Sequence, residues 1–164
     1  MLIAVPMETD PIESRVAASP DTVKRLVALG AKVAVEAGSG LASGITDADF
    51  TAAGATIGKG VAADADIVLK VRRPSAAELK GMKAGAIVIA TMDPYGQDAA
   101  LAAMAKAGIS AFAMELMPRI TRAQVMDVLS SQANLAGYRA VIDASGEFAR
   151  AFPMMMTAAG TVPA

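Results

Sequence analysis

The chain contains no cysteine, no histidine and no tryptophan among its 164 residues. The absence of cysteine excludes disulfides, thiolate catalysis and cysteine-based metal sites. The absence of histidine removes the commonest general base and the commonest metal ligand. Any chemistry therefore depends on Arg, Lys, Asp, Glu, Ser, Thr or Tyr side chains. This composition argues against a self-contained hydrolase and against a metalloenzyme, and we predict neither a metal site nor a catalytic acid–base residue.

Long apolar runs and clusters of one charge are also missing. No stretch approaches the roughly 18 consecutive apolar residues that a membrane-spanning helix needs. The opening residues 1–6 lack a basic region and are typical of a first strand, not of a signal peptide. Acidic and basic residues are interspersed and give a net charge of -1. The sequence therefore lacks the clustered basic residues that are typical of nucleic-acid binding. The length fits a single domain, and 54% hydrophobic residues with few aromatics indicate a core built from small side chains.

Strand-like and helix-like patterns alternate along the first two thirds of the chain. Strands are expected at residues 2–6, 32–36, 66–71, 86–90 and 109–113, and helices near 20–29, 46–53, 75–79 and 97–107. The strand runs are continuously apolar instead of alternating, which is typical of a parallel sheet covered on both faces. The predicted fold is therefore α/β, with a doubly wound, mostly parallel sheet of the flavodoxin/Rossmann-like kind and long C-terminal helices.

The pattern changes after Glu115. Residues 121–152 are expected to be helical, with a break or bend near Gly137, and residues 153–164 have no helical period. We therefore expect a domain at 1–152 and a connector at 153–164 that leads to a further part outside this chain.

The helix expected from residue 121 has an unusual polar side. Thr121 and Gln124 have the spacing of a capping box. At about 100° per residue, the side next to Gln124 carries only short polar residues and no Lys or Glu: Asp127, Ser130, Ser131 and Asn134. Arg119 precedes this helix and places a positive charge nearby. Two interpretations are open, namely a face that meets a polar ligand or a polar packing seam between helices.

Two segments are the most specific to a family: residues 114–143, MELMPRITRAQVMDVLSSQANLAGYRAVID, and residues 147–163, EFARAFPMMMTAAGTVP. With these segments the sequence resembles the alpha subunit of proton-translocating NAD(P) transhydrogenases, and the resemblance covers nearly its whole length. The opening is similar to both alanine dehydrogenases and transhydrogenases, in ESRVA at 13–17, Ser-Pro at 19–20, ITDADF at 45–50 and AGA at 53–55. The chain is thereby identified as a member of the alanine dehydrogenase/pyridine nucleotide transhydrogenase family.

The resemblance implies which residues meet the cofactor. In that family the N-terminal domain packs against a dinucleotide-binding domain, and NAD(H) lies in the cleft between them. It implies that Arg119 and Asp127 form a linked charged pair beside the nicotinamide, while Gln124 and Ser130 add hydrogen bonds. The nicotinamides carry the chemistry, so the resemblance assigns cofactor-binding residues and no catalytic residue to this chain.

The resemblance also implies partners and a setting. Transhydrogenases move a hydride equivalent between NAD(H) and NADP(H) and couple this to proton passage through a membrane. The expected partners are the missing NAD-binding domain of the same subunit, the membrane and NADP-binding components, and a second copy in a homodimer. The expected location is cytoplasmic and peripheral at the bacterial inner membrane, and the chain alone is expected to be inactive. The alternatives are an amino-acid dehydrogenase fragment and a non-catalytic packing or dimerisation module.

Two departures separate this chain from alanine dehydrogenases. Their catalytic lysine is matched by Arg72, and the segment after the strand at 86–90 has no histidine. A guanidinium stays protonated and cannot titrate near neutral pH, so alanine deamination is not expected. Arg15 and Lys70 remain candidates for binding an anion, although the basic run 70–73 is interpreted first as a solvated strand end.

Overall fold

The computed structural model describes residues 1–164, which divide into two units, Met1–Pro118 and Arg119–Ala164. The first unit is built on a six-stranded sheet: β1 Leu2–Val5, β2 Lys32–Glu36, β3 Thr56–Gly58, β4 Ile67–Arg72, β5 Ile87–Thr91 and β6 Ser110–Ala113. Every neighbouring pair is parallel, in the order β3-β2-β1-β4-β5-β6. The predicted doubly wound parallel fold is confirmed, with the strand order reversing between β1 and β4.

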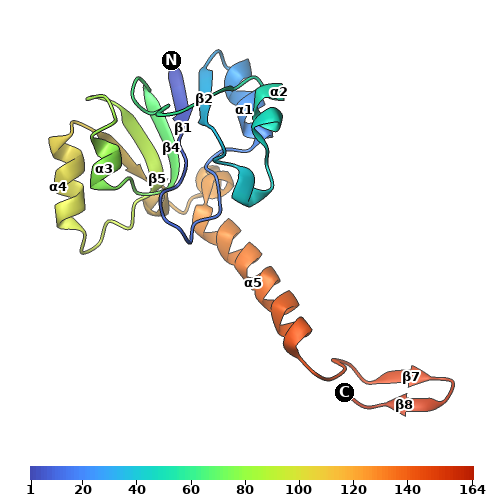
Figure 1. The fold of residues 1–164 in the computed structure, drawn as a ribbon. Coiled ribbons are helices and arrows are strands. Elements are labelled where there is room, and N and C mark those ends of the chain that lie inside the picture. Colours follow the sequence, from blue (N-terminus) through green and yellow to red (C-terminus); the bar gives the residue numbers. More distant parts are fainter. The chain divides into compact units, whose positions relative to one another are not determined.

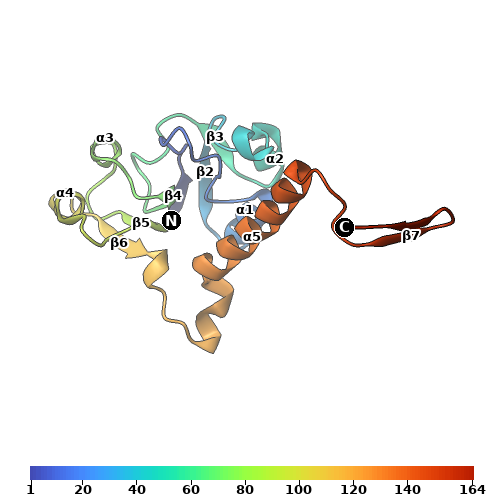
Figure 2. The same ribbon diagram turned by 90° about the horizontal axis from the view of Figure 1, so that it is seen from below.

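Helices cover both faces of this sheet (Figures 1 and 2). The helical segments of the first unit are α1 Pro20–Ala28, η1 Leu41–Ser43, α2 Asp47–Ala52, α3 Ala76–Leu79, α4 Asp98–Lys106 and η2 Met114–Leu116. The pair α1–α2 lies beside β1 and β2, whereas α3 and α4 lie together on the other side of the sheet (Figure 1). This is the two-sided cover that the continuously apolar strands predict.

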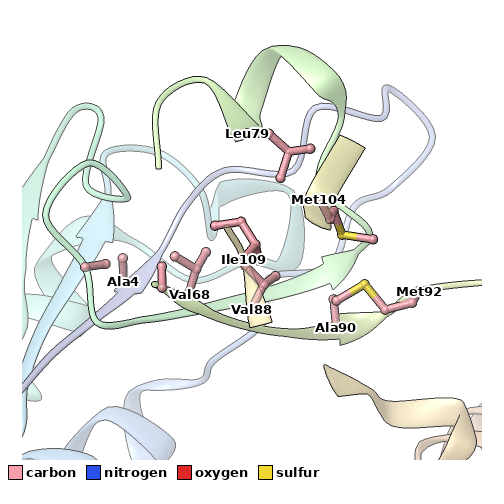
Figure 3. Close-up of a cluster of buried hydrophobic side chains, with 10 residues drawn as sticks. Ala4, Val68, Leu79, Val88, Ala90, Met92, Met104 and Ile109 are labelled. Atoms are coloured by element: carbon pink, nitrogen blue, oxygen red, sulfur yellow. The ribbon is translucent and has the colours of Figure 1, made fainter. Parts of the chain in front are cut away.

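Two apolar clusters fill the space between sheet and helices. Val5 of β1 belongs to the cluster that takes Val23 from α1 and Phe50 from α2. Its neighbour Ala4 points to the opposite face, because successive strand side chains alternate. The second cluster brings Leu79 of α3 and Met104 of α4 over side chains of β4 and β5, as Figure 3 shows. Both clusters consist of hydrophobic side chains. Polar side chains that could bind a ligand in this unit are therefore expected at the ends of the strands.

Three of the helices begin with a side-chain cap, at positions where the sequence predicts a helix. Ser19 caps α1 by accepting from the Thr22 N–H, with Pro20 as the first helical residue. Thr46 and Ser75 each form a capping box at the start of α2 and α3. The short strand β3 was not predicted, because three residues show no periodicity.

The second unit differs from the expectation of a helical segment over 121–152 with a break or bend near Gly137. It contains a 3₁₀ helix η3 at Thr121–Met126, the helix α5 at Val128–Glu147, and an antiparallel hairpin of β7 Met155–Thr157 and β8 Gly160–Val162. The capping box predicted at Thr121 is wrong, because η3 has no side-chain cap. The break also lies elsewhere: Gly137 is inside an uninterrupted α5, and the helix starts anew after Asp127.

The two units of the structure meet after Pro118. The expected domain at 1–152 stays a prediction. The last twelve residues contain the β7–β8 hairpin, and their role as a connector stays a prediction. None of the helices combines the length and apolarity that crossing a membrane requires.

Candidate functional site

The four residues Arg119, Gln124, Asp127 and Ser130, which we name the junction site, surround the break between η3 and α5. Asp127 is the N-cap of α5, and its Oδ1 accepts the N–H groups of Leu129 at 2.9 Å and Ser130 at 3.0 Å. The Ser130 hydroxyl donates to Asp127 Oδ2 at 2.7 Å. A side chain that satisfies the first free N–H groups of a helix fixes where that helix begins. The structure therefore joins two of the four predicted site residues in one capping motif.

Charge at the junction site is fixed by the same contacts. The hydrogen bonds from Ser130, first from its N–H and then from its hydroxyl, hold the pKa of Asp127 below its usual range, and the Arg119 charge adds to this. Asp127 is therefore a carboxylate at neutral pH. Arg119 acts on it through space, so the linked charged pair is electrostatic and not a contact ion pair.

Gln124 joins the site through the backbone. Its carbonyl oxygen accepts the Asp127 N–H at 3.2 Å, while its side chain is exposed. Because η3 and α5 are separate helices, Gln124 does not share a helix face with Asp127 and Ser130, whereas Ser130, Ser131 and Asn134 keep their expected spacing on α5. The Ser131 hydroxyl donates to the Asp127 carbonyl oxygen at 2.9 Å. Ser130 and Ser131 therefore both form side-chain hydrogen bonds with the N-cap residue Asp127.

A second polar group lies in the first unit at the carboxyl edge of the sheet, where the strand order reverses. Open α/β sheets bind ligands at this place. Here it holds the switch-point cluster, three carboxylates and three cations: Glu8, Glu13, Glu78, Arg15, Lys70 and Arg72. The interpretation of residues 70–73 as a solvated strand end is wrong for Lys70, whose side chain is only 1% exposed.

Lys70 is paired with carboxylates of its own chain. Its Nζ lies 2.8 Å from Glu78 Oε1 and 3.2 Å from Glu8 Oε2. Burial alone would raise the pKa of Glu78, but the hydrogen bonds from Lys70 and the Ser75 N–H outweigh this and hold that pKa below its usual range. A buried lysine in an apolar strand requires such partners.

Glu13 links the two arginines. Its Oε1 accepts from Arg15 Nε at 2.6 Å and its Oε2 from Arg72 Nε at 2.9 Å, with the Glu13 side chain 4% exposed. The hydrogen bond from Arg15 is the largest cause that lowers the pKa of Glu13 to about 2. Both guanidinium groups therefore already have an anion, which weakens the hypothesis that Arg15 binds an external one.

A cavity of about 610 Å³ opens beside this cluster, between the ends of β1, β4 and β5. Arg73 lines this cavity, and its guanidinium group donates to the carbonyl oxygens of Met92 and Asp93 at 2.5 and 2.8 Å. The Glu115 carboxylate accepts the N–H groups of the same two residues. These contacts hold Asp93 at a φ of 44°, a left-handed conformation uncommon for a residue with a side chain.

The first unit does not fit the pyrophosphate of a dinucleotide. Such a group requires a glycine-rich turn and a helix N-terminus directly after the first strand. After Val5 the chain reads Pro-Met-Glu, and the Glu8 carboxylate lies at the switch point. The turn at Gly38 and Gly40 follows β2, and Gly40 is packed against Phe50 and Ile45. The residues that the family resemblance assigns to a nicotinamide end are those of the junction site, in the second unit.

Comparison with known proteins places the chain in a family. The sequence profile of the N-terminal domain of alanine dehydrogenase/PNT proteins matches residues 4–136. The chain belongs to this family. Within it, an NAD(P) transhydrogenase subunit alpha protein of Rhodospirillum rubrum is 55% identical over 99% of the chain, and alanine dehydrogenase of Mycobacterium tuberculosis is 36% identical over 84%.

Solved structures give the same order of similarity. A transhydrogenase from Sinorhizobium meliloti superposes on 100% of the chain with a TM-score of 0.95 and 62% identity. An L-alanine dehydrogenase superposes on 70% with a TM-score of 0.67 and 30% identity. The chain spans 44% of the length of the Rhodospirillum relative and 50% of the Sinorhizobium structure. This family member is therefore more similar to transhydrogenase subunits than to alanine dehydrogenases.

Proposed function

We propose that the chain belongs to the NAD(H)-binding component of a proton-translocating NAD(P) transhydrogenase, in which the junction site contacts the nicotinamide end of NAD(H). The observation that carries this proposal is the Asp127 carboxylate, which α5 and Ser130 hold in one orientation beside the Arg119 charge. The identity of 55% to a transhydrogenase subunit over almost the whole chain supports it.

The nicotinamide supplies the hydride, so the residues of this chain act by orientation and charge. Asp127 Oδ2 accepts from Ser130 and keeps a second lone pair for a donor such as a carboxamide or a ribose hydroxyl. Arg119 supplies a charge that does not titrate at neutral pH. The exposed amide of Gln124 can both donate and accept. None of the four side chains transfers a proton in this proposal, which suits direct hydride transfer.

The phosphates of NAD(H) then depend on a region of the protein beyond this chain. Isothermal titration tests this split site by comparing residues 1–164 with the complete subunit. We expect micromolar NADH binding to the complete subunit and weak or no binding to the chain alone. Micromolar binding to the chain alone would contradict the split site.

The proposal includes partners for the second unit. No residue of α5 is buried, and a shallow groove of about 480 Å³ on it exposes Tyr138, Val141 and Ile142. We propose that the remainder of the same subunit covers this face, since the chain spans 44% of the length of the Rhodospirillum relative. A homodimer and attachment to membrane and NADP(H)-binding components complete the proposal. Light scattering of the complete subunit tests the dimer, and a monomer mass would contradict it.

A further inference from the structure

Glu8 occupies a place at the switch point that has the features of an anion-binding site. Its Oε1 accepts the Val71 N–H at 2.7 Å, and its Oε2 accepts the Arg72 N–H at 3.3 Å. The Lys70 ammonium lies 3.2 Å from Oε2, and both side chains are nearly inaccessible, with 3% of Glu8 and 1% of Lys70 exposed. Two successive backbone N–H groups and a buried ammonium thus converge on one carboxylate.

The donors of this site belong to β4, whereas the carboxylate that they bind comes from a distant loop. Lys70, Val71 and Arg72 lie at the carboxyl end of β4, whereas Glu8 comes from the loop after β1, 63 residues before Val71. Successive backbone N–H groups form concave sites for anions, and the switch point is where open α/β sheets take their ligands. The loop is held there by a second contact, because the Met7 N–H donates to Glu36 Oε2 at 2.9 Å.

We propose that the end of β4 is a carboxylate-binding site whose resident ligand is Glu8 of the same chain, and that it accepts a small external carboxylate when Glu8 is removed. The loop residue thereby keeps the switch point closed to free carboxylates in the native protein. This inference does not depend on the proposed transhydrogenase function, because it concerns contacts within the first unit.

The charges of the surrounding cluster agree with a single resident anion. Three carboxylates face three cations in the switch-point cluster. An additional external carboxylate would place an unbalanced negative charge beside the buried carboxylates of Glu8 and Glu13, which burial disfavours. Replacement of Glu8 by alanine leaves Lys70 paired with Glu78 and removes one negative charge, so one external anion restores the balance.

The test is chemical rescue of Glu8→Ala by acetate in the full protein. Acetate has the same heavy atoms as the deleted Cγ and carboxylate of Glu8. We expect Glu8→Ala to melt about 10 °C below the wild type. Half-molar acetate should restore about 3–5 °C, while sodium chloride at equal ionic strength restores none. With ¹⁵N-valine labelling, the Val71 amide signal of the variant should shift saturably with acetate, with a dissociation constant of about 10–100 mM.

Controls separate this site from a general salt effect. The wild type and Glu147→Ala, which removes an exposed charge on α5, should show neither rescue nor a Val71 shift. A wild-type shift equal to that of the variant, or a folded Glu8→Ala without a saturable shift, would overturn the proposal. If Glu8→Ala does not fold, Glu8→Gln provides the test: exchange of the Val71 amide hydrogen should accelerate about tenfold with Val68 unchanged. Equal exchange at Val71 would overturn the proposal as well.

Discussion

Asp127 and Ser130 are joined twice, through the Ser130 N–H at 3.0 Å and the Ser130 hydroxyl at 2.7 Å, both to the Asp127 carboxylate. The same carboxylate begins α5 and lies at the centre of the proposed nicotinamide contact. Substitutions at Asp127 therefore have to be separated into effects on the helix and effects on the ligand.

Asp127→Ala should fray the first turn of α5, whereas Asp127→Asn should not, because asparagine caps helices about as well as aspartate. The measurement is hydrogen exchange of the Ser130 and Ser131 amides. We expect about tenfold faster exchange in Asp127→Ala and little change in Asp127→Asn. Equal protection in both variants would show that the cap does not set the helix start.

Glu13 should contribute to the pH dependence of stability. Its pKa falls from 4.5 in a free side chain to about 2 in the folded protein. Its stabilising effect is therefore complete above about pH 5 and is lost as the pH falls toward about 2. The full shift corresponds to roughly 3 kcal/mol, and the half-exposed guanidinium groups of Arg15 and Arg72 reduce this to about 1–2 kcal/mol.

Denaturant unfolding of Glu13→Gln between pH 2 and pH 7 checks this expectation. The difference in stability from the wild type should be about 1–2 kcal/mol at pH 7 and should shrink toward pH 2. Glu147→Gln, at an exposed position, is the matched control and should change the profile little. A Glu13→Gln profile parallel to that of the wild type throughout would contradict the assigned pKa.

Lys70→Met should be strongly destabilising although methionine fits an apolar strand. It leaves the carboxylates of Glu8 and Glu78 close together without their cation, and such a change costs about 3–5 kcal/mol. Lys24→Met removes an exposed lysine that is 3.8 Å from Asp21 and should cost less than about 0.5 kcal/mol. Urea unfolding compares the two variants. A similar small loss in both would show that Lys70 is not needed to balance the buried charges.

The sequence predicts the elements of the first unit well, because their signals are local. Ser19 with Pro20, Thr46 and Ser75 mark helix starts that the structure has, and the continuous apolar runs predict the parallel sheet. The break at Asp127 was missed because two local hydrogen-bonding patterns compete there. The capping-box spacing at Thr121 is equally good in sequence, and only the cap at Asp127 forms.

The polar contacts between distant segments were less predictable. Glu8 and Val71 are 63 residues apart, and no pattern within either segment identifies the other as its partner. The basic run at 70–73 indicated charge but not that Lys70 is buried. The roles of Arg119, Gln124, Asp127 and Ser130 came from a family resemblance and stay proposals, whereas the geometry adds the contacts between Asp127 and Ser130.

The protein should show no alanine dehydrogenase activity. Imine formation and reduction require proton transfers near neutral pH. Arg72, which the family resemblance matches to the catalytic lysine of alanine dehydrogenases, donates to Glu13 at 2.9 Å. The assay is NADH oxidation with pyruvate and ammonium, using the complete subunit. Hydride transfer from NADH to an oxidised nicotinamide analogue, in the presence of the NADP(H)-binding component, is the positive control. Turnover with pyruvate well above background would favour the amino-acid dehydrogenase alternative.

Single-turnover hydride transfer in the complete protein tests most directly whether Arg119 and Asp127 act on the nicotinamide. Asp127→Asn and Arg119→Ala should each slow transfer about tenfold or more, since about 1.4 kcal/mol of misplacement is one decade in rate. The matched controls Asp143→Asn on α5 and Arg122→Ala on η3 should transfer at the wild-type rate. Wild-type rates in both Asp127→Asn and Arg119→Ala would contradict the claim and leave the junction site with a structural role alone.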